Sequence, residues 1–172
     1  MTVDEWAALP EDEGGELVDG RLVEEEVPDL THEIVVRWLV VHLDRWAEAR
    51  EAQVFGSGAK LAVAEDRGRM PDVTVFFAGR RLPARGVVRV PPDIAVEVVS
   101  TAPSDVRRDR VEKLDDYAAF GVRWYWIVDP QIRTFEVWEL TDGRYARVGV
   151  AATGAVSEIP GCEGLELDLD DL

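Results

Sequence analysis

An acidic residue, Glu97, stands inside a run of apolar and β-branched residues between Ile94 and Val99. Side chains alternate along a β-strand, so Glu97 shares one face of an expected strand over 93–99 with Ala95 and Val99. A carboxylate among such neighbours is costly to bury unless it is paired, hydrogen-bonded or bound to a metal ion. Two interpretations are open: a structural acid, in a buried ion pair or at a strand end that reaches solvent, or an acid retained for chemistry.

Two aspartates that follow prolines, Asp72 and Asp93, are the candidate partners of Glu97. Asp93 would share its face but lies four residues away, about 13 Å along a strand at ~3.3 Å per residue. Two carboxylates that share one Mg²⁺ at ligand distances of about 2.1 Å cannot be so far apart, so we assign Asp93 a structural role. Asp72 begins a second apolar strand, 73–77, and pairing of that strand with 93–99 would bring it close to Glu97. A simple turn residue is the alternative interpretation of Asp72.

A metal-bound anion also needs a nearby cation to stabilise the developing charge. The chain has only two lysines, Lys60 and Lys113, beside seventeen arginines. Lys113 is spaced by four residues from Asp109 and from Tyr117, which places all three on one stripe of an expected helix. An exposed Asp–Lys pair is the simpler interpretation, whereas a rare lysine in an arginine-rich chain favours a role that arginine cannot fill. Lys60 is the second choice.

The net charge of −16 is unevenly distributed along the 172 residues. Residues 1–29 hold eleven acids and one base, and residues 158–172 hold six acids and no base. Subtracting these from 35 acids and 19 bases leaves 18 of each in residues 30–157. Nucleic-acid binding normally needs a basic surface, and this neutral middle part leaves such binding possible. The acidic ends fit solubility, dimer contacts or repulsion of the wrong polyanion.

Length and composition indicate one domain over residues 1–172, with acidic N-terminal (1–29) and C-terminal (158–172) segments. A single cysteine, Cys162, excludes an internal disulfide and does not build a zinc site. We find neither a run of about 18 apolar residues nor a signal-peptide pattern, so we expect a cytoplasmic protein that does not enter the membrane.

Spacing and capping signals predict alternating helices and strands. Thr2 and Glu5 form a capping box for a helix over 3–9, and Asp19-Gly20 predicts a hairpin. An apolar stripe that includes Ile34 predicts a helix from Thr31 to about Arg50. A second helix is expected over 105–120, with Ser104 as N-cap and Gly121 as its end, and strands over 59–64, 73–77, 93–99, 124–128, 134–140 and 144–150. This order predicts a mixed α/β or α+β layer fold, with an arginine-rich loop over 79–92.

Several segments in this order resemble a known family. They are Pro71-Asp72, the run 92–100 around Glu97, the run 109–113, Tyr117, and the run 121–130. Together with the hairpin that begins at Glu16 and the helix that opens with His32, they resemble the Uma-two family. This is a bacterial group described as endonucleases within the restriction-endonuclease-like, PD-(D/E)xK superfamily. The resemblance extends over nearly the whole chain.

The resemblance implies a restriction-endonuclease-like fold, with a central mixed β-sheet flanked by helices. Asp72 and Glu97 are similar to the family's metal-binding acids. The usual lysine of the superfamily would fall at position 99, where this chain has Val99, and in this family the cation comes from the following helix, where Lys113 stands. Further candidate site residues are Glu16, His32, Asp109 and Tyr117; local packing at a helix start is the alternative for His32.

The leading hypothesis is therefore an Mg²⁺- or Mn²⁺-dependent endonuclease that acts on nucleic acid, with DNA as the expected substrate. Asp72, Glu97 and the main-chain carbonyl of Val98 would hold the metal ion, and Lys113 would orient the water or stabilise the transition state. A homodimer is the family-like expectation. Candidate phosphate contacts are the arginines at 80, 81, 85, 107, 108 and 110.

Two alternatives stand beside the endonuclease. The acidic ends and Val99 fit a nuclease fold that serves as a binding or assembly module, to which the six tryptophans could supply an interface. A glycosidase with two acids lacks an aromatic sugar platform and is the weakest reading.

Overall fold

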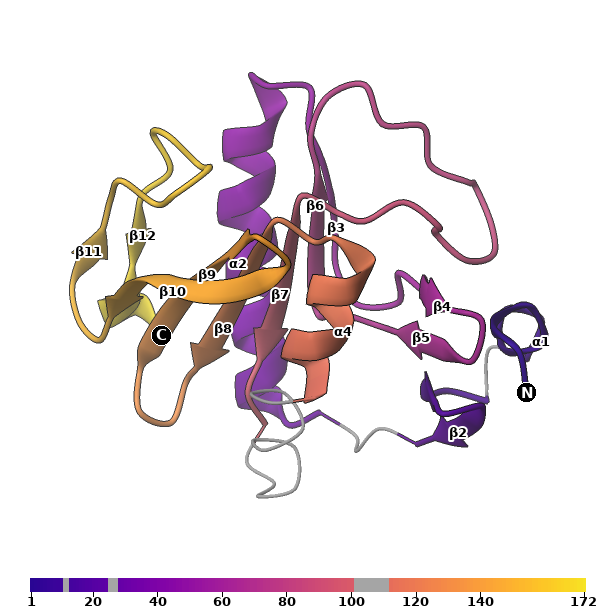
Figure 1. The fold of residues 1–172 in the computed structure, drawn as a ribbon. Coiled ribbons are helices and arrows are strands. Elements are labelled where there is room, and N and C mark those ends of the chain that lie inside the picture. Colours follow the sequence, from indigo (N-terminus) through magenta and orange to yellow (C-terminus); the bar gives the residue numbers. More distant parts are fainter. Residues whose placement is uncertain (11–12, 25–27, 101–111) are drawn as a thin grey trace.

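The computed structural model describes residues 1–10, 13–24, 28–100 and 112–172 (Figure 1). Its centre is a six-stranded sheet in the order β10-β9-β8-β7-β6-β3. In this sheet β7 and β8 run parallel, whereas the other neighbouring strands are antiparallel. The strands are β3 (Gln53–Phe55), β6 (Val73–Phe76), β7 (Ile94–Val98), β8 (Trp124–Asp129), β9 (Thr134–Thr141) and β10 (Arg144–Ala151). The predicted mixed sheet of an α+β fold is confirmed.

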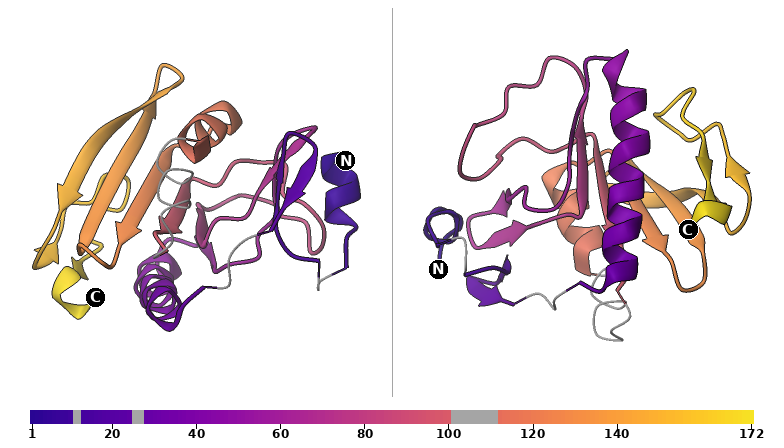
Figure 2. Two further views of the ribbon diagram at one scale, coloured as in Figure 1. Left: turned by 90° about the horizontal axis from the view of Figure 1, so that it is seen from below. Right: turned by 180° about the vertical axis from the view of Figure 1, so that it is seen from behind.

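One face of this sheet is covered by α2 (Leu30–Glu48), which stands in front of the sheet in the right-hand view of Figure 2, where the molecule is seen from behind. Val35 and Leu39 of α2 belong to one core cluster with Val96 and Val98 of β7. Alternation along the strand explains this choice, because residues two apart share a face. The even-numbered side chains of β7 are therefore buried under α2.

The opposite face carries α4 (Lys113–Phe120), seen in front of the sheet in Figure 1. Tyr117 of α4 packs in a second core cluster with Ala95, Val99 and Tyr125. Glu97 lies between Ala95 and Val99 on that same face, so α4 is the helix that faces the acid.

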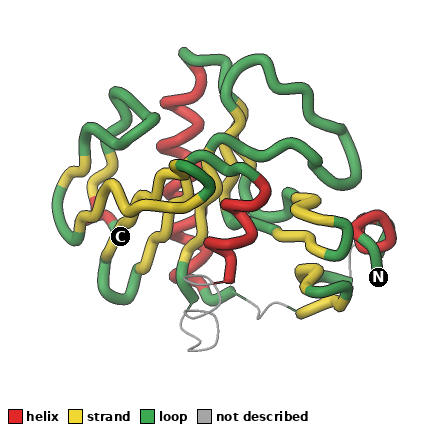
Figure 3. The backbone as a smooth tube through the Cα atoms, viewed as in Figure 1, coloured by secondary structure: helices red, strands yellow, loops and turns green. Residues whose placement is uncertain are grey.

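A smaller four-stranded sheet, β2-β1-β5-β4, stands beside α4, and the short helix α1 (Val3–Ala7) packs on it (Figure 3). Trp6 of α1 is fully buried, and its ring lies over Gly68. The strands of this sheet are β1 (Glu16–Val18), β2 (Arg21–Val23), β4 (Leu61–Ala64) and β5 (Arg67–Arg69). The C-terminal part holds β11 (Ala155–Val156), β12 (Leu167–Asp168) and the 3₁₀ helix η2 (Leu169–Asp171).

Most expected elements are confirmed with shifted ends. Asp29 caps α2 by accepting a hydrogen bond from the His32 amide at 2.9 Å, so the helix begins before the expected Thr31. Ile34 is 64% exposed, and the expectation that it lies in the buried stripe is wrong, since the stripe that faces the sheet is centred on Leu39. Gly121 ends α4 with a positive φ of 92°, as predicted.

Four short strands, β3, β5, β11 and β12, had no counterpart in the sequence prediction, because two or three residues show no periodicity. Ser104 and the first part of the expected helix 105–120 lie outside the described residues. Among the helices of the described ranges, none is both long enough and apolar enough to cross a membrane.

Candidate active site

The pairing of β6 with β7 brings Asp72 to Glu97. Val73 lies opposite Val96 in this antiparallel pair, so Asp72, one residue before β6, is next to Glu97 in the register. The Asp72 carboxylate accepts a hydrogen bond from the main-chain amide of Val98 at 2.7 Å. This bond holds the side chain of Asp72 against the end of β7, the strand that carries Glu97.

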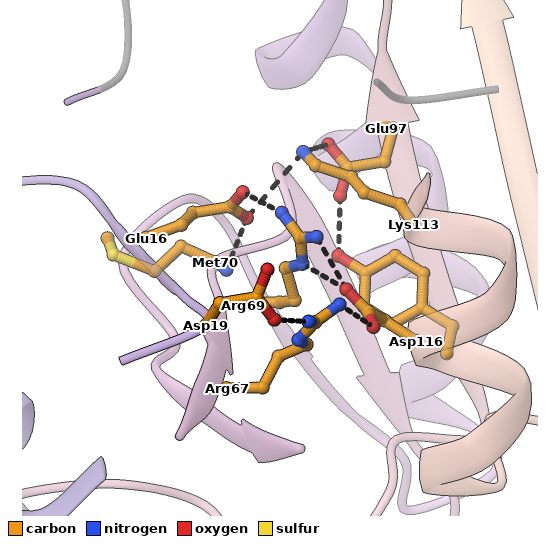
Figure 4. Close-up of polar contacts among 9 residues, drawn as sticks. Glu16, Asp19, Arg67, Arg69, Met70, Glu97, Lys113 and Asp116 are labelled. Atoms are coloured by element: carbon orange, nitrogen blue, oxygen red, sulfur yellow. Dashed lines mark hydrogen bonds and ion pairs between the residues drawn. The ribbon is translucent and has the colours of Figure 1, made fainter. Parts of the chain in front are cut away.

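Glu97 is 3% exposed, and both of its carboxylate oxygens accept hydrogen bonds (Figure 4). The Lys113 ammonium donates to Oε2 at 2.8 Å, and the Tyr117 hydroxyl donates to Oε1 at 2.5 Å. Glu97 and Lys113 therefore form a buried ion pair, which is one of the two interpretations that the strand pattern allowed. The same contacts place a cation and a phenol at the acid, so they also fit a site for chemistry.

The four-residue spacing of Lys113 and Tyr117 places both side chains on the inner side of α4. Lys113 is 3% exposed, so the simpler interpretation of an exposed Asp–Lys pair is wrong for this lysine. Asp109, its expected partner one turn earlier, lies outside the described residues. The side chain of Lys113 also approaches Glu16 of β1, with 3.6 Å between Nζ and Oε1.

A second group of buried charges adjoins this pair. Arg69 of β5 is fully buried and donates to Glu16 Oε2 at 2.6 Å and to Asp116 Oδ2 at 2.7 Å (Figure 4). Glu16 Oε1 also accepts a hydrogen bond from the Met70 amide at 3.0 Å. Arg69 thus links β1 to α4, the helix that carries Lys113, and sequence reasoning missed both Arg69 and Asp116.

Each carboxylate of this group faces at least one cation. The carboxylates of Glu16, Glu97 and Asp116 face the buried cations Arg69 and Lys113, and the half-buried Arg67 adds a third cation by donating to Asp116 at 2.8 Å. Buried charges persist only when they are paired in this way. We call these five buried residues, Glu16, Arg69, Glu97, Lys113 and Asp116, the charge network.

Burial and neighbouring charges shift the pKa values of the site. Burial raises the pKa of Glu16, but the charges of Lys113 and Arg69 outweigh it, and its pKa falls below the usual 4.5. Burial, and then the charge of Glu97, raise the pKa of Tyr117 well above 10.0. Tyr117 is therefore a neutral hydroxyl donor over the whole physiological pH range.

His32, at the start of α2, contacts Asp72 from the other side of the sheet. Its Nε2 lies 3.2 Å from Asp72 Oδ1, and the residue is 7% exposed. Burial lowers the pKa of His32, but the hydrogen bond and charge of Asp72, with a further contribution from Glu33, raise it above 6.5 overall. Local packing alone does not describe this ring, because it contacts an acid on another element as well as the neighbouring Glu33.

The donor set fits a hard divalent cation. Mg²⁺ is commonly held by one or two carboxylates and completes its shell with water, and Asp72 and Glu97 supply two carboxylates at adjoining strand positions. Within the described ranges, no group of three or more His, Cys, Asp or Glu side chains could hold a metal ion. Zinc, which prefers His and Cys ligands, fits this set less well.

Asp93 and Lys60 have their contacts apart from this site. Asp93 accepts hydrogen bonds from the Phe77 amide at 2.7 Å and from Arg80 at 3.0 Å, which fits the structural role expected for it. Lys60 donates to the Trp6 carbonyl at 3.2 Å and lies over the Trp6 ring. The arginines at 107, 108 and 110 lie outside the described residues.

Comparison with known proteins points to one family. A family model described as "Uma2: Putative restriction endonuclease" matches residues 3–170. Among solved structures, the chain is similar to a protein from Anabaena variabilis ATCC 29413 described as "a putative nuclease belonging to DUF820". The TM-score is 0.76 at 20% identity, over 99% of this chain and 96% of that chain, which shows a shared fold. Among curated proteins no match is found.

Proposed function

Since this chain belongs to the Uma2 family of restriction-endonuclease-like proteins, we propose that it is a metal-dependent endonuclease that hydrolyses phosphodiester bonds of DNA. One observation carries the proposal. Glu97 is buried next to Asp72 and is bonded to both Lys113 and Tyr117. Two acids and a cation at one strand end are the groups that metal-assisted phosphodiester hydrolysis needs.

Asp72, Glu97 and the Val98 carbonyl would hold Mg²⁺ or Mn²⁺. The bound ion would supply an activated water and neutralise charge on the scissile phosphate. The hydrogen bond from the Val98 amide and the contact of His32 hold Asp72 from two sides. Such supporting contacts fix the orientation of a ligand before the metal arrives.

Lys113 is the proposed cationic group of the reaction. Val99, which occupies the usual lysine position of the superfamily, is 1% exposed and packs in the same core cluster as Tyr117. Because α4 covers that same sheet face, a lysine from α4 reaches Glu97 at 2.8 Å. Its ammonium would donate a hydrogen bond to a non-bridging phosphate oxygen or to the attacking water.

Tyr117 would orient the carboxylate of Glu97, and Glu16 would orient the ammonium of Lys113. Tyr117 donates to Glu97 Oε1 and leaves Oε2 directed to Lys113. Glu16 provides Lys113 with a second anion at 3.6 Å, so the buried ammonium is paired with two carboxylates. Both are positioning roles, because neither side chain is assigned a contact with the substrate.

Cleavage of supercoiled plasmid and of single-stranded DNA and RNA in Mg²⁺ or Mn²⁺ tests the proposal. We expect DNA cleavage that is lost on chelation and lost in Asp72→Asn and Glu97→Gln. A matched control is Glu139→Gln, which makes the same change at a half-buried acid of β9 that pairs with the exposed Arg123. The proposal fails if the wild-type protein cuts no more than Asp72→Asn.

A binding or assembly module is the second candidate, because both oxygens of Glu97 already accept hydrogen bonds from Lys113 and Tyr117. Calorimetric titration with Mn²⁺ separates the two. Binding that disappears in Glu97→Gln supports the enzyme, whereas the absence of binding to the wild-type protein supports the module.

A further inference from the structure

A cavity of about 440 Å³ opens between two loops on the sheet face that carries Glu97. Its walls come from residues 55–60, between β3 and β4, and from residues 82–88 of the wide loop after β6 (Figure 1). Phe55 lies opposite Thr74, and Thr74 lies opposite Ala95. Because Ala95 and Glu97 share a face of β7, Phe55 belongs to the face of the candidate active site.

One wall of the cavity is the accessible aromatic ring of Phe55, which packs against a buried side chain. Phe55 is 41% exposed, and its ring meets the fully buried ring of Phe76 edge-on at 6.1 Å between centroids. Leu82 and Pro83 line the cavity from the other loop. A rigid, exposed aromatic face beside apolar neighbours suits a flat ring such as a nucleobase, which stacks on aromatic side chains without sequence preference.

The loop that forms one wall of the cavity is basic in a strongly acidic protein. Residues 78–92 contain four arginines and no acid, although the chain carries a net charge of −16. Arg80 is paired with Asp93 and Arg89 with Asp4. Arg81 and Arg85 are exposed, and Arg85 lines the cavity. Within the described ranges neither of these two is paired with an acid, so both are available to an outside anion.

We propose that this cavity is a second nucleotide-binding subsite. It takes one unstacked base of a single-stranded nucleic-acid segment against Phe55, and the adjoining phosphate against Arg85 and Arg81. An apolar slot with cations at its edge matches a ligand that joins a flat ring to a phosphate. The inference rests on the proposed function, since it assigns a further contact to the same substrate.

The register of the sheet sets the distance between the subsite and the reacting groups. From Glu97 to Ala95 is two steps along a strand, and from Ala95 to Phe55 is two strand spacings, which together give about 12 Å between the Glu97 and Phe55 Cα atoms. At about 3.4 Å for each stacked nucleotide, that distance corresponds to at most three or four nucleotides, and to fewer where the strand is extended. The substrate therefore needs an unpaired stretch of about this length beside the scissile phosphate.

Binding without metal tests the subsite separately from cleavage. The probe is a fluorescent single-stranded DNA of about 12 nucleotides, within the range of known single-strand site sizes. Its anisotropy is measured in EDTA at low salt. We expect Phe55→Leu, which removes the ring but keeps an apolar side chain, to weaken binding by about 5- to 100-fold. Arg85→Gln should also weaken binding, whereas Arg144→Gln on the edge strand β10 makes the same charge change away from the cavity and should leave binding intact.

The possible results separate the two proposals. Wild-type affinity in both Phe55→Leu and Arg85→Gln overturns the subsite, as does a wild-type protein that binds no single strand. A protein that cuts DNA in Mn²⁺ while Phe55→Leu changes nothing keeps the endonuclease and loses the subsite. A protein that binds the strand through Phe55 but never cuts it keeps the subsite and contradicts the endonuclease. Thermal melts of each variant confirm folding, which is expected because Phe55 and Arg85 are both exposed.

Discussion

Replacing Arg69 by methionine should strongly destabilise the fold, because this guanidinium is the buried bridge between two elements. It is fully buried, and it bonds to Glu16 on β1 and to Asp116 on α4. Removing one partner of a buried ion pair typically costs about 3–5 kcal/mol. Each carboxylate keeps a second cation, Lys113 for Glu16 and Arg67 for Asp116, so we expect the lower end of this range.

The assay is thermal unfolding of Arg69→Met followed by circular dichroism. For a chain of this size, each kcal/mol lowers the Tm by about 2–4 °C, so a loss of about 3 kcal/mol predicts a decrease of about 6–12 °C. The matched control is Arg89→Met, which breaks the exposed pair with Asp4 and should cost about 1 kcal/mol or less.

A double variant identifies the cause of the loss. Glu16→Gln combined with Arg69→Met removes one carboxylate together with its cation, so the two free-energy changes should sum to more than the change in the double variant. An Arg69→Met protein as stable as Arg89→Met, or fully additive changes in the double variant, would show that the charge network does not stabilise the packing of β1 and β5 against α4.

Three further predictions concern the carboxyl group of Glu16, the packing of Gly68 on Trp6, and Lys113. The folded-state pKa of Glu16 lies below its usual 4.5. Its contribution to stability is therefore present above about pH 4.5 and is lost as the pH falls through the folded pKa. Glu16→Gln should flatten that part of a pH–stability profile measured by urea unfolding. Gly68→Ala would place a methyl group 2.3 Å from the Trp6 ring and should cost about 1–3 kcal/mol, whereas Gly14→Ala, with open space around it, should cost much less in the same melts. Lys113→Gln should lower DNA cleavage by at least tenfold while Mn²⁺ binding by calorimetry persists; unchanged cleavage would contradict its role.

The core of the site could be predicted from the sequence because it follows strand geometry. Alternation placed Glu97 on one face of β7, and the strand spacing excluded Asp93 as its partner in a metal site. The pairing of β6 with β7 could only be supposed from the sequence, and the structure shows it. Lys113 was indicated by the scarcity of lysine, and its spacing from Tyr117 is realised on α4.

Arg69 and Asp116 could not be predicted, because nothing local marks them. Arg69 lies in a three-residue strand without periodicity, and its partners are 53 and 47 residues away in the chain. In the sequence, Asp116 is typical of a surface acid on a charged helix, and only its contact with Arg69 of β5 shows that it is buried. Spacing alone also could not predict the exposure of Ile34. Its spacing fits a buried stripe, but its exposure depends on which side of α2 the sheet covers.

The proposed function requires that Asp72 and Glu97 hold a metal ion. Diffraction from a crystal soaked in Mn²⁺, measured at the manganese absorption edge, tests this requirement, because the anomalous signal locates the metal without reference to activity. We expect one anomalous peak bound by both carboxylates, with the Lys113 amine nearby. An anomalous map without a peak at these two acids, from crystals soaked in millimolar Mn²⁺, would contradict it.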